Sequence, residues 1–199
     1  MGCLKKILQI IVLALALIGF ISIGGKDFII AQYEKYMGNS KEAVMERASK
    51  VGDFSNISEE YTIDKAASAF GYQGVLAEHD ASGQKLIIVN TGKKPIVTSQ
   101  DFKDGTVDEK LQDFIRKFKY QSLQVDDFTI TKQGTMNAYN QEVPYVRFTA
   151  KINKLPIGQV GGIISAVDTG SNESKMLISL NENKKYSQLI TNEFFKQVK

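Results

Sequence analysis

Residues 72–90 read YQGVLAEHDASGQKLIIVN, and this segment carries the clearest fold signal in the sequence. Two runs of strand-forming residues flank the polar turn at 80–83, and this pattern predicts a β-hairpin. A four-residue turn sets three cross-strand pairs: Glu78 with Lys85, Val75 with Ile88, and Leu76 with Ile87. Because neighbouring residues of a strand point to opposite faces, Val75 and Leu76 make both faces of the hairpin apolar. The sheet that contains this hairpin therefore needs a covering layer on each side.

Two amphipathic helices are predicted to supply those layers. The sequence Thr106-Val107-Asp108-Glu109 is a capping box, which is typical of a helix start. The apolar stripe associated with it consists of Val107, Leu111, Phe114, Ile115 and Phe118. A second stripe, later in the chain, consists of Tyr186, Leu189, Ile190, Phe194 and Val198. Each stripe gives its helix one apolar side that can pack on a sheet.

Further strands are expected before and after the first of these helices. A weak strand is predicted at 61–70, and four more follow the helix, at 128–135, 143–152, 158–168 and 175–180. The strand at 158–168 is apolar on both faces, which is typical of a central strand. The predicted fold class is α+β: an N-terminal transmembrane helix, then an antiparallel β-sheet of about seven strands covered by helices on both faces.

This order of elements resembles the sandwich of the PsbP family, the extrinsic photosystem proteins, and of its relative that binds the nuclear-transport GTPase. The resemblance covers roughly residues 58–199. It is carried by the strand meander, the helix opened by Thr106, the four-strand run and the terminal helix at 185–198. The resemblance implies a small accessory or binding protein and not an enzyme. No functional residue is carried over, because no motif matches residue by residue, and cystatin-like folds are an alternative.

The net charge of the chain comes from its beginning. The 199 residues include 25 basic and 22 acidic ones and carry a formal charge of +3. Three lysines and no acidic residue precede Asp27, so the remainder of the chain is neutral. A neutral body argues against nucleic acid as a partner, because that affinity comes largely from Lys and Arg. Cys3 is the single cysteine, so no disulfide can form within the chain.

Residues 7–23, ILQIIVLALALIGFISI, carry no charge and lack the polar stripe of a soluble helix. Extended to residues 4–25, the segment is about 33 Å long as a helix, which matches a hydrocarbon core of about 30 Å. It is predicted to anchor the chain in membrane lipid. The anchor residues include Ile7, Ile11, Leu15, Ile18 and Ile23. Lys5 and Lys6 precede the span, which places the N-terminus in the cytoplasm and the C-terminal domain outside it.

A cleaved signal peptide is the alternative to an anchor, and it would make the domain a secreted protein. Ser22-Ile23-Gly24 places small residues at both positions of a cleavage site. A retained anchor is favoured because the apolar run is long for a signal peptide. It is also favoured because apolar and aromatic residues resume at Phe28, an arrangement suited to the membrane interface.

The sequence divides into three parts: a cytoplasmic tip and anchor at 1–26, a helical juxtamembrane stalk at 27–52, and an extracytoplasmic domain at 53–199. One side of the first stalk segment carries Phe28, Ile29, Tyr33, Tyr36 and Met37. Asn39 or Ser40 is expected to cap a second helical segment. The apolar residues of that segment are Val44, Met45, Ala48 and Val51. This part of the chain is either a stalk or a docking helix.

His79 is the only histidine, so a serine hydrolase would have to use it, with Ser82 nearby. Glu78 cannot orient His79, because adjacent strand residues point to opposite faces. One histidine and one cysteine are too few for a zinc site. Gly161 and Gly162 lack the lysine that follows in a phosphate loop, and they indicate close backbone packing or a bulge. The sequence therefore predicts no catalytic residue, no metal and no cofactor.

A non-catalytic binding or accessory domain is expected, with an envelope protein as the candidate partner. The turn at 136–140 joins two strands that Phe128 and Phe148 help to fix, and rigidly supported turns commonly carry binding residues. Met136 and Tyr139 are expected to expose apolar area in this turn and to contact the partner. The alternative function is a membrane-anchored or secreted hydrolase that uses His79.

Overall fold

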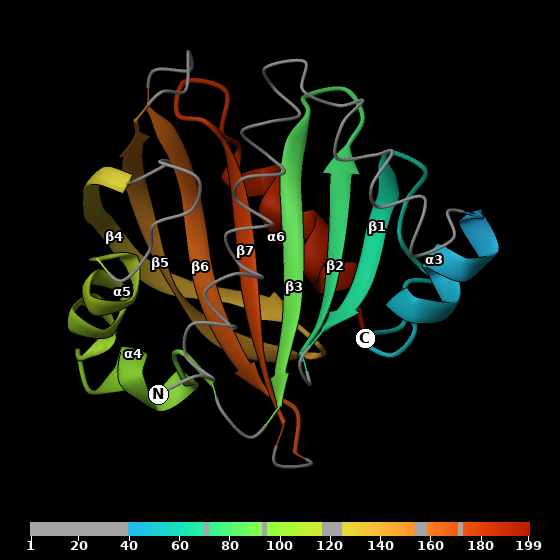
Figure 1. Ribbon diagram of the computed structural model, residues 1–199, viewed down its shortest axis with the longest axis horizontal. Helices are drawn as coiled ribbons and strands as arrows, with labels where there is room; N and C mark the ends of the chain where they lie inside the picture. The colour runs from blue at the N-terminus through green and yellow to red at the C-terminus, as the bar shows by residue number, and fades with distance from the viewer. Residues whose placement is uncertain (1–39, 70–71, 93–94, 117–124, 154–158, 171–172) are drawn as a thin grey trace.

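The structure is a computed structural model that describes residues 40–69, 72–92, 95–116, 125–153, 159–170 and 173–199. Seven strands form one antiparallel sheet (Figure 1). They are β1 (Tyr61–Ala69), β2 (Tyr72–His79), β3 (Gln84–Gly92), β4 (Val125–Ala138), β5 (Gln141–Ile152), β6 (Val160–Asp168) and β7 (Ser174–Glu182). The helices among the described residues are α3 (Lys41–Ala48), α4 (Ser99–Lys103), α5 (Val107–Arg116) and α6 (Gln188–Gln197). The predicted α+β class with a seven-strand antiparallel sheet is confirmed.

Two three-strand meanders make up the sheet, and β7 joins them. The strand order is β1-β2-β3-β7-β6-β5-β4, so β7 pairs with the last strand of each meander. The three predicted hairpin pairs are confirmed: Glu78 faces Lys85, Val75 faces Ile88, and Leu76 faces Ile87. Gly83 closes this hairpin with a φ of 68°, in the left-handed region that favours glycine.

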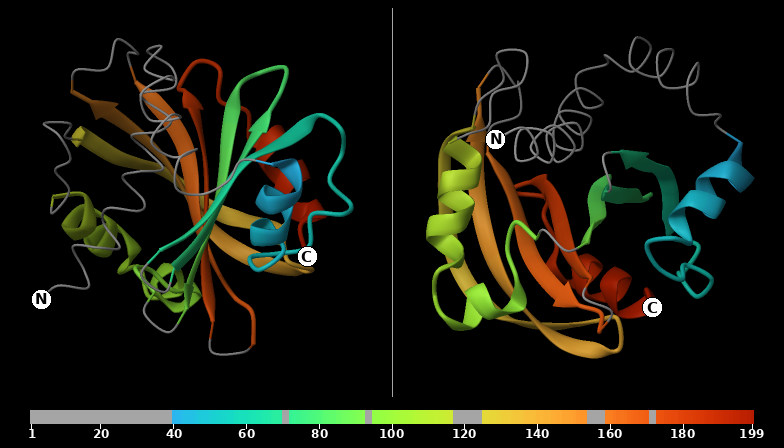
Figure 2. Two further views of the ribbon diagram at one scale, coloured as in Figure 1. Left: turned by 45° about the vertical axis from the view of Figure 1, so that its right-hand side comes forward. Right: turned by 60° about the horizontal axis from the view of Figure 1, so that its bottom comes forward.

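We name the two faces of the sheet after the helices that cover them. The α6 face is covered by α6 and α3, and its buried strand residues include Val75, Leu86, Ile88, Tyr145, Ile163 and Leu177. The α5 face is covered by α5 and α4, and its buried strand residues include Leu76, Ile87, Val146, Phe148, Ile164 and Ile178. Figure 2 shows α5 and α6 on opposite sides of the sheet. The layer that the sequence requires on each side is present.

A buried polar network fixes α6 to the sheet. The Gln84 side chain is fully buried, and its Nε2 donates to Ser179 Oγ at 3.0 Å and to Thr191 Oγ1 at 2.9 Å. The same nitrogen lies 2.9 Å from the Ser187 carbonyl, and the Ser187 backbone N–H donates to Gln84 Oε1 at 2.8 Å. Buried polar groups that find partners favour one packing arrangement over others. The network therefore sets where α6 begins on the sheet.

Helix α3 packs against β1. Ser40 Oγ caps the helix by accepting a hydrogen bond from the Ala43 backbone N–H at 3.2 Å. Arg47 Nε donates to the Ala66 carbonyl of β1 at 2.9 Å. The buried residues of α3 are Val44 and Ala48. The segment from Ser40 onward is therefore a docking helix, while residues 27–39 of the predicted stalk lie outside the described residues.

Three details of the helices differ from the sequence prediction. Helix α4 was not predicted, because five residues are too few to show an apolar stripe. In α6, Leu189 is 69% exposed and Thr191 is buried, so the side that faces the sheet is rotated relative to the predicted stripe. In α5, Phe114 is only partly buried, and Phe118 lies outside the described residues.

The predicted membrane span at 7–23 also lies outside the described residues. Among the helices that are described, none is long and apolar enough to cross a membrane. The anchor therefore stays a prediction from the sequence.

Candidate functional site: an apolar cavity beneath helix α5

A cavity of about 60 Å³ lies between α5 and the sheet. The side chains that line it are all apolar: Leu111, Phe114, Ile115, Val125, Phe128, Phe148, Ala150, Ile152, Val160, Ile164, Met176 and Ile178. Helix α5 supplies one wall, and strands β4, β5, β6 and β7 supply the rest. Cavities with such a lining stay dry and can accept apolar guests.

The lining of the cavity divides by exposure into a floor and a rim. The floor consists of buried residues: Leu111, Phe148, Ala150, Val160, Ile164, Met176 and Ile178. The rim consists of partly exposed residues: Phe114, Ile115, Val125, Phe128 and Ile152. The less buried part of the lining therefore comes from the end of α5 and the adjoining parts of β4 and β5.

Gly162 makes room for an aromatic ring in the floor. Phe148 on β5 pairs with Gly162 on β6, and a Cβ atom at Gly162 would overlap the Ser179 carbonyl oxygen and lie 3.0 Å from the Phe148 ring. The Phe128 ring stacks on Phe148, with centroids 5.3 Å apart and planes 25° from parallel. The sequence indicated either close packing or a bulge at Gly161 and Gly162. Close packing is confirmed, because a Cβ at Gly161 would meet Asn183.

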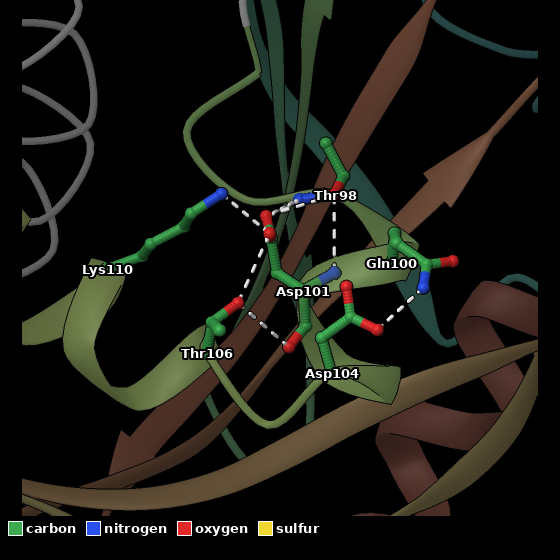
Figure 3. Close-up of polar contacts among 6 residues, drawn as sticks. All are labelled: Thr98, Gln100, Asp101, Asp104, Thr106 and Lys110. Atoms are coloured by element: carbon green, nitrogen blue, oxygen red, sulfur yellow. Dashed lines mark hydrogen bonds and ion pairs between the residues drawn. The ribbon is translucent and has the colours of Figure 1, made fainter.

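A cluster of polar contacts holds the start of α5 against α4 (Figure 3). Thr98 and Asp101 form a capping box at the start of α4. The Asp101 carboxylate then reaches α5, where Lys110 Nζ donates to its Oδ1 at 2.6 Å. Thr106, just before α5, donates more weakly to the same oxygen at 3.4 Å. One buried carboxylate thus connects both helices that cover this face.

The pKa of the Asp101 carboxyl reflects these contacts. Burial alone would raise it, but hydrogen bonds from Lys110 and from the Thr98 backbone and side chain outweigh burial and lower the pKa below its ordinary value. Further along α5, Gln112 Nε2 donates to the Phe128 carbonyl of β4 at 3.1 Å. Helix α5 is therefore held by polar contacts at its start and middle, and by partly buried apolar side chains nearer its end.

The chemistry of the cavity follows from its lining. None of its side chains offers a hydrogen-bond donor, an acceptor of ordinary strength or a charge. A polar ligand group would lose its hydrogen bonds to water there without replacement, which costs about 1–3 kcal/mol or more. An uncharged apolar group instead gains about 25 cal/mol for each Å² that leaves water. The site is suited to binding an apolar group.

The structure places His79 at the mouth of the β2–β3 hairpin. Its Nδ1 lies 2.9 Å from Ser82 Oγ and accepts the Ser82 backbone N–H at 3.2 Å. The ring contacts Tyr61 edge to face, with centroids 5.3 Å apart. Glu78 points to the other face, where it forms an ion pair with Lys85, as strand alternation predicts. His79 and Ser82 are both part of the β2–β3 turn, which is closed by the Gly83 N–H donating to the His79 carbonyl at 2.8 Å. The turn by itself therefore brings these two side chains together.

The expectation that Met136 and Tyr139 expose apolar area is wrong. Strand β4 continues to Ala138, and the turn is only Tyr139 and Asn140, with φ values of 51° and 58°. Met136 is therefore part of the strand and is only 5% exposed in the core of the α6 face. The Tyr139 hydroxyl donates to the Val51 carbonyl at 3.2 Å.

Tyr139 has further contacts that tie it to the domain. Lys175 Nζ lies 4.2 Å from the centre of its ring, a cation–π contact. Burial raises the pKa of the Tyr139 phenol well above its ordinary value. These contacts have no local sequence signal, because Tyr139 bonds to Val51, a residue before β1 that is distant in the chain.

The cavity itself was not predicted. The sequence identifies most of its lining as apolar strand and helix residues, but a volume left between two packed layers has no sequence signature. The available signal was the apolar character of Phe128, Ile152 and the α5 stripe, which the sequence alone does not bring together. The described residues contain no group of three or more His, Cys, Asp or Glu side chains placed to hold a metal ion.

No protein-family model matches the chain, and no curated protein matches it. The resemblance to the PsbP family stays a prediction from the order of elements.

Proposed function

We propose that the protein is a membrane-anchored, extracytoplasmic binding domain whose site is the cavity beneath α5. Its ligand would be an uncharged apolar group, such as the acyl chain of a lipid. The observation that supports this proposal is the lining of the cavity, which is apolar at every position. The membrane anchor rests on the sequence at 7–23, and it would keep the domain beside a supply of acyl chains.

The size of the cavity favours a slender ligand. A cavity of about 150 Å³ with a similar lining can hold benzene, whereas this one has about 60 Å³. A short stretch of methylene groups fits such a space, and each buried methylene group contributes about 0.8 kcal/mol. A longer stretch requires the end of α5 to move away from the sheet. The partly exposed Phe114 and Ile115 are the side chains that would move.

Photolabelling of the full chain in phosphatidylcholine vesicles tests the proposal, with a diazirine-bearing fatty acid as the probe. We expect label on peptides from α5 and β5 and little on α6. Ala150→Leu fills the floor of the cavity and should lower α5 labelling about tenfold, which corresponds to 1.4 kcal/mol. Lys151→Leu is the matched control, because the exposed Lys151 is the next residue along β5 and points to the other face.

Two results would contradict the proposal. One is equal labelling of α5 and α6 in the unmodified chain. The other is a fall in α5 labelling that is equally large in the Lys151→Leu and Ala150→Leu variants. Thermal unfolding of both variants serves as the control for folding.

A hydrolase that uses His79 is the second candidate, and the 2.9 Å contact between His79 Nδ1 and Ser82 Oγ favours it. In this function, His79 would take the proton of the Ser82 hydroxyl as that oxygen attacks an ester. Hydrolysis of a p-nitrophenyl ester that is abolished by both His79→Ala and Ser82→Ala would establish it. Equal hydrolysis by the two variants and the unmodified chain would reject it.

A further inference from the structure

Two cationic side chains lie opposite each other on neighbouring strands, because Lys132 of β4 pairs with Arg147 of β5. Both are on the α6 face. Arg147 lies over the ring of Tyr186, just before α6, and Lys132 alternates with Met136 in the core of that face. Like charges directly opposite each other destabilise a sheet. A lysine on an edge strand can discourage pairing with other chains, but that role does not call for an arginine opposite it.

No carboxylate neutralises this pair. Neither Lys132 nor Arg147 forms an ion pair with any Asp or Glu of the described residues, and the Arg147 guanidinium donates no hydrogen bond to them. Further along the same face, Lys151 of β5 pairs with Asp127 of β4, so that pair is balanced in charge. On the α6 face of these two strands, the uncompensated charge is therefore confined to Lys132 and Arg147.

The Arg147 side chain is held on a fixed support. Its Cζ lies 5.1 Å from the centre of the Tyr186 ring, a cation–π contact. The Tyr186 hydroxyl in turn forms a hydrogen bond with Thr191 Oγ1 at 3.0 Å, which connects it to the buried Gln84 network. A guanidinium has five N–H donors in a rigid plane. The group is therefore positioned by the ring while its donors are available to a ligand.

We propose that Lys132 and Arg147 form a binding site for a phosphate monoester group. The planar guanidinium can donate to two phosphate oxygens at once, and the lysine ammonium supplies a second positive charge for a third oxygen. A phosphate monoester carries a charge of about −1.5 to −2 at pH 7, which matches two cations. A carboxylate has two oxygens and one charge, so the guanidinium alone would satisfy it.

The site lies on the opposite face of the sheet from the apolar cavity, because Arg147 and the cavity residue Phe148 are neighbours along β5. Binding of phosphate and binding of an apolar group can therefore be tested separately, and the failure of one leaves the other intact.

The arginines of the chain provide a direct test, because each side-chain Nε–H gives its own NMR signal. They are Arg47, Arg116 and Arg147. The full chain, isotope-labelled at arginine and held in maltoside micelles, is titrated with inorganic phosphate at constant ionic strength. We expect the Arg147 signal to shift and saturate while the other two stay in place. Arg47 is an internal control, since its Nε already donates to the Ala66 carbonyl.

Lys132→Gln removes one of the two cations and should weaken phosphate binding about tenfold, the change that 1.4 kcal/mol produces. Lys151→Gln is the matched control, because it removes the same charge from the same face at a position that Asp127 balances. Phosphate affinity should be the same in this control as in the unmodified chain. An equal loss of affinity in both variants would overturn the proposal, because it would mean that phosphate responds only to overall charge.

Thermal unfolding at low salt without phosphate gives a readout that does not depend on binding. Lys132→Gln should raise the melting temperature by about 1–2 °C, because it removes the repulsion between the two cations. Lys151→Gln should not raise it. A Lys132→Gln variant that is less stable than the unmodified chain would mean that this pair serves the fold, and would overturn the proposal.

Two sources of the phosphate group are distinguished by moving the labelled chain into phosphatidylcholine nanodiscs with and without phosphatidic acid. A shift of the Arg147 signal with phosphatidic acid, in the absence of free phosphate, would support a lipid headgroup as the ligand. A shift with inorganic phosphate alone would support a soluble phosphate monoester. Equal shifts of all the arginine signals, or no shift of the Arg147 signal with either probe, would overturn the proposal.

Discussion

The two faces of the sheet use similar side chains but differ in how firmly they are covered. On the α6 face, Phe194 and Phe195 of α6 are fully buried, and the Gln84 network fixes the start of that helix. On the α5 face, Phe114 of α5 is partly exposed and a cavity remains beneath it. An apolar stripe alone therefore does not determine how densely a helix packs on the sheet. Both helices have polar contacts near their starts, and the faces differ in that the aromatic rings of α6 are fully buried whereas Phe114 of α5 is not.

The largest effect is expected on the α6 face. Phe194→Ala removes a fully buried ring and should lower the free energy of unfolding by about 3–5 kcal/mol. Urea unfolding of the unmodified and variant chains measures this loss. A loss below about 0.5 kcal/mol, as for a surface position, would mean that the α6 face is not the rigid one.

Met136→Ala tests whether the β4–β5 turn belongs to the same core. Because Met136 is 5% exposed, its truncation should lower the free energy of unfolding by about 2–5 kcal/mol. The same urea titration serves here, with Asn137→Ala, exposed on the same strand, as the control. Equal stability of the two variants would restore Met136 as a surface residue available to a partner.

The polar network should contribute less than the core side chains. Thr191→Val keeps the volume of the side chain but removes the buried hydroxyl that accepts from Gln84 Nε2 and donates to Ser179 Oγ, which should cost about 1–3 kcal/mol. Thermal unfolding measures the change. A variant as stable as the unmodified chain would show that the apolar side chains alone position α6.

Phe114→Ala is the counterpart of Phe194→Ala on the less firmly covered face. Since Phe114 is partly exposed, we expect a loss of about 1 kcal/mol, the centre of the distribution for point substitutions. A loss as large as that of Phe194→Ala would contradict the comparison between the faces. It would show that α5 is packed as firmly as α6.

The smallest effect is a pH dependence at the start of α5. The folded-state pKa of Asp101 lies below its ordinary value of 3.8, so its ionised form stabilises the fold above that pH. This stabilisation is lost as the pH falls through the folded-state pKa. Asp101→Asn should therefore be less stable than the unmodified chain at pH 7, and the difference should shrink below about pH 4. A difference that is constant with pH would assign the effect to hydrogen bonding alone.

Much of the fold is predictable from the sequence, because short-range patterns determine it. The 80–83 turn sets the hairpin register, and the apolar pair at Val75 and Leu76 requires two layers. The strand order is harder to predict, since β7 inserts between two meanders through long-range pairing. The candidate site is harder still, because a cavity depends on how closely α5 approaches Phe148. Tyr139 was misjudged for the same reason: its partner, Val51, is 88 residues away in the chain.

The place of β7 in the sheet has a consequence for how the protein is made. The first meander ends at Gly92 and the second at Asp168, but the strand that pairs with both begins only at Ser174. A ribosome that adds about 5–20 residues each second therefore delivers the first meander long before β7, and the second meander immediately before it. For a domain that has to cross a membrane, as we propose, this delay is useful. Until β7 emerges, β3 lacks the strand that joins it to the second meander, so the two halves cannot yet form one sheet.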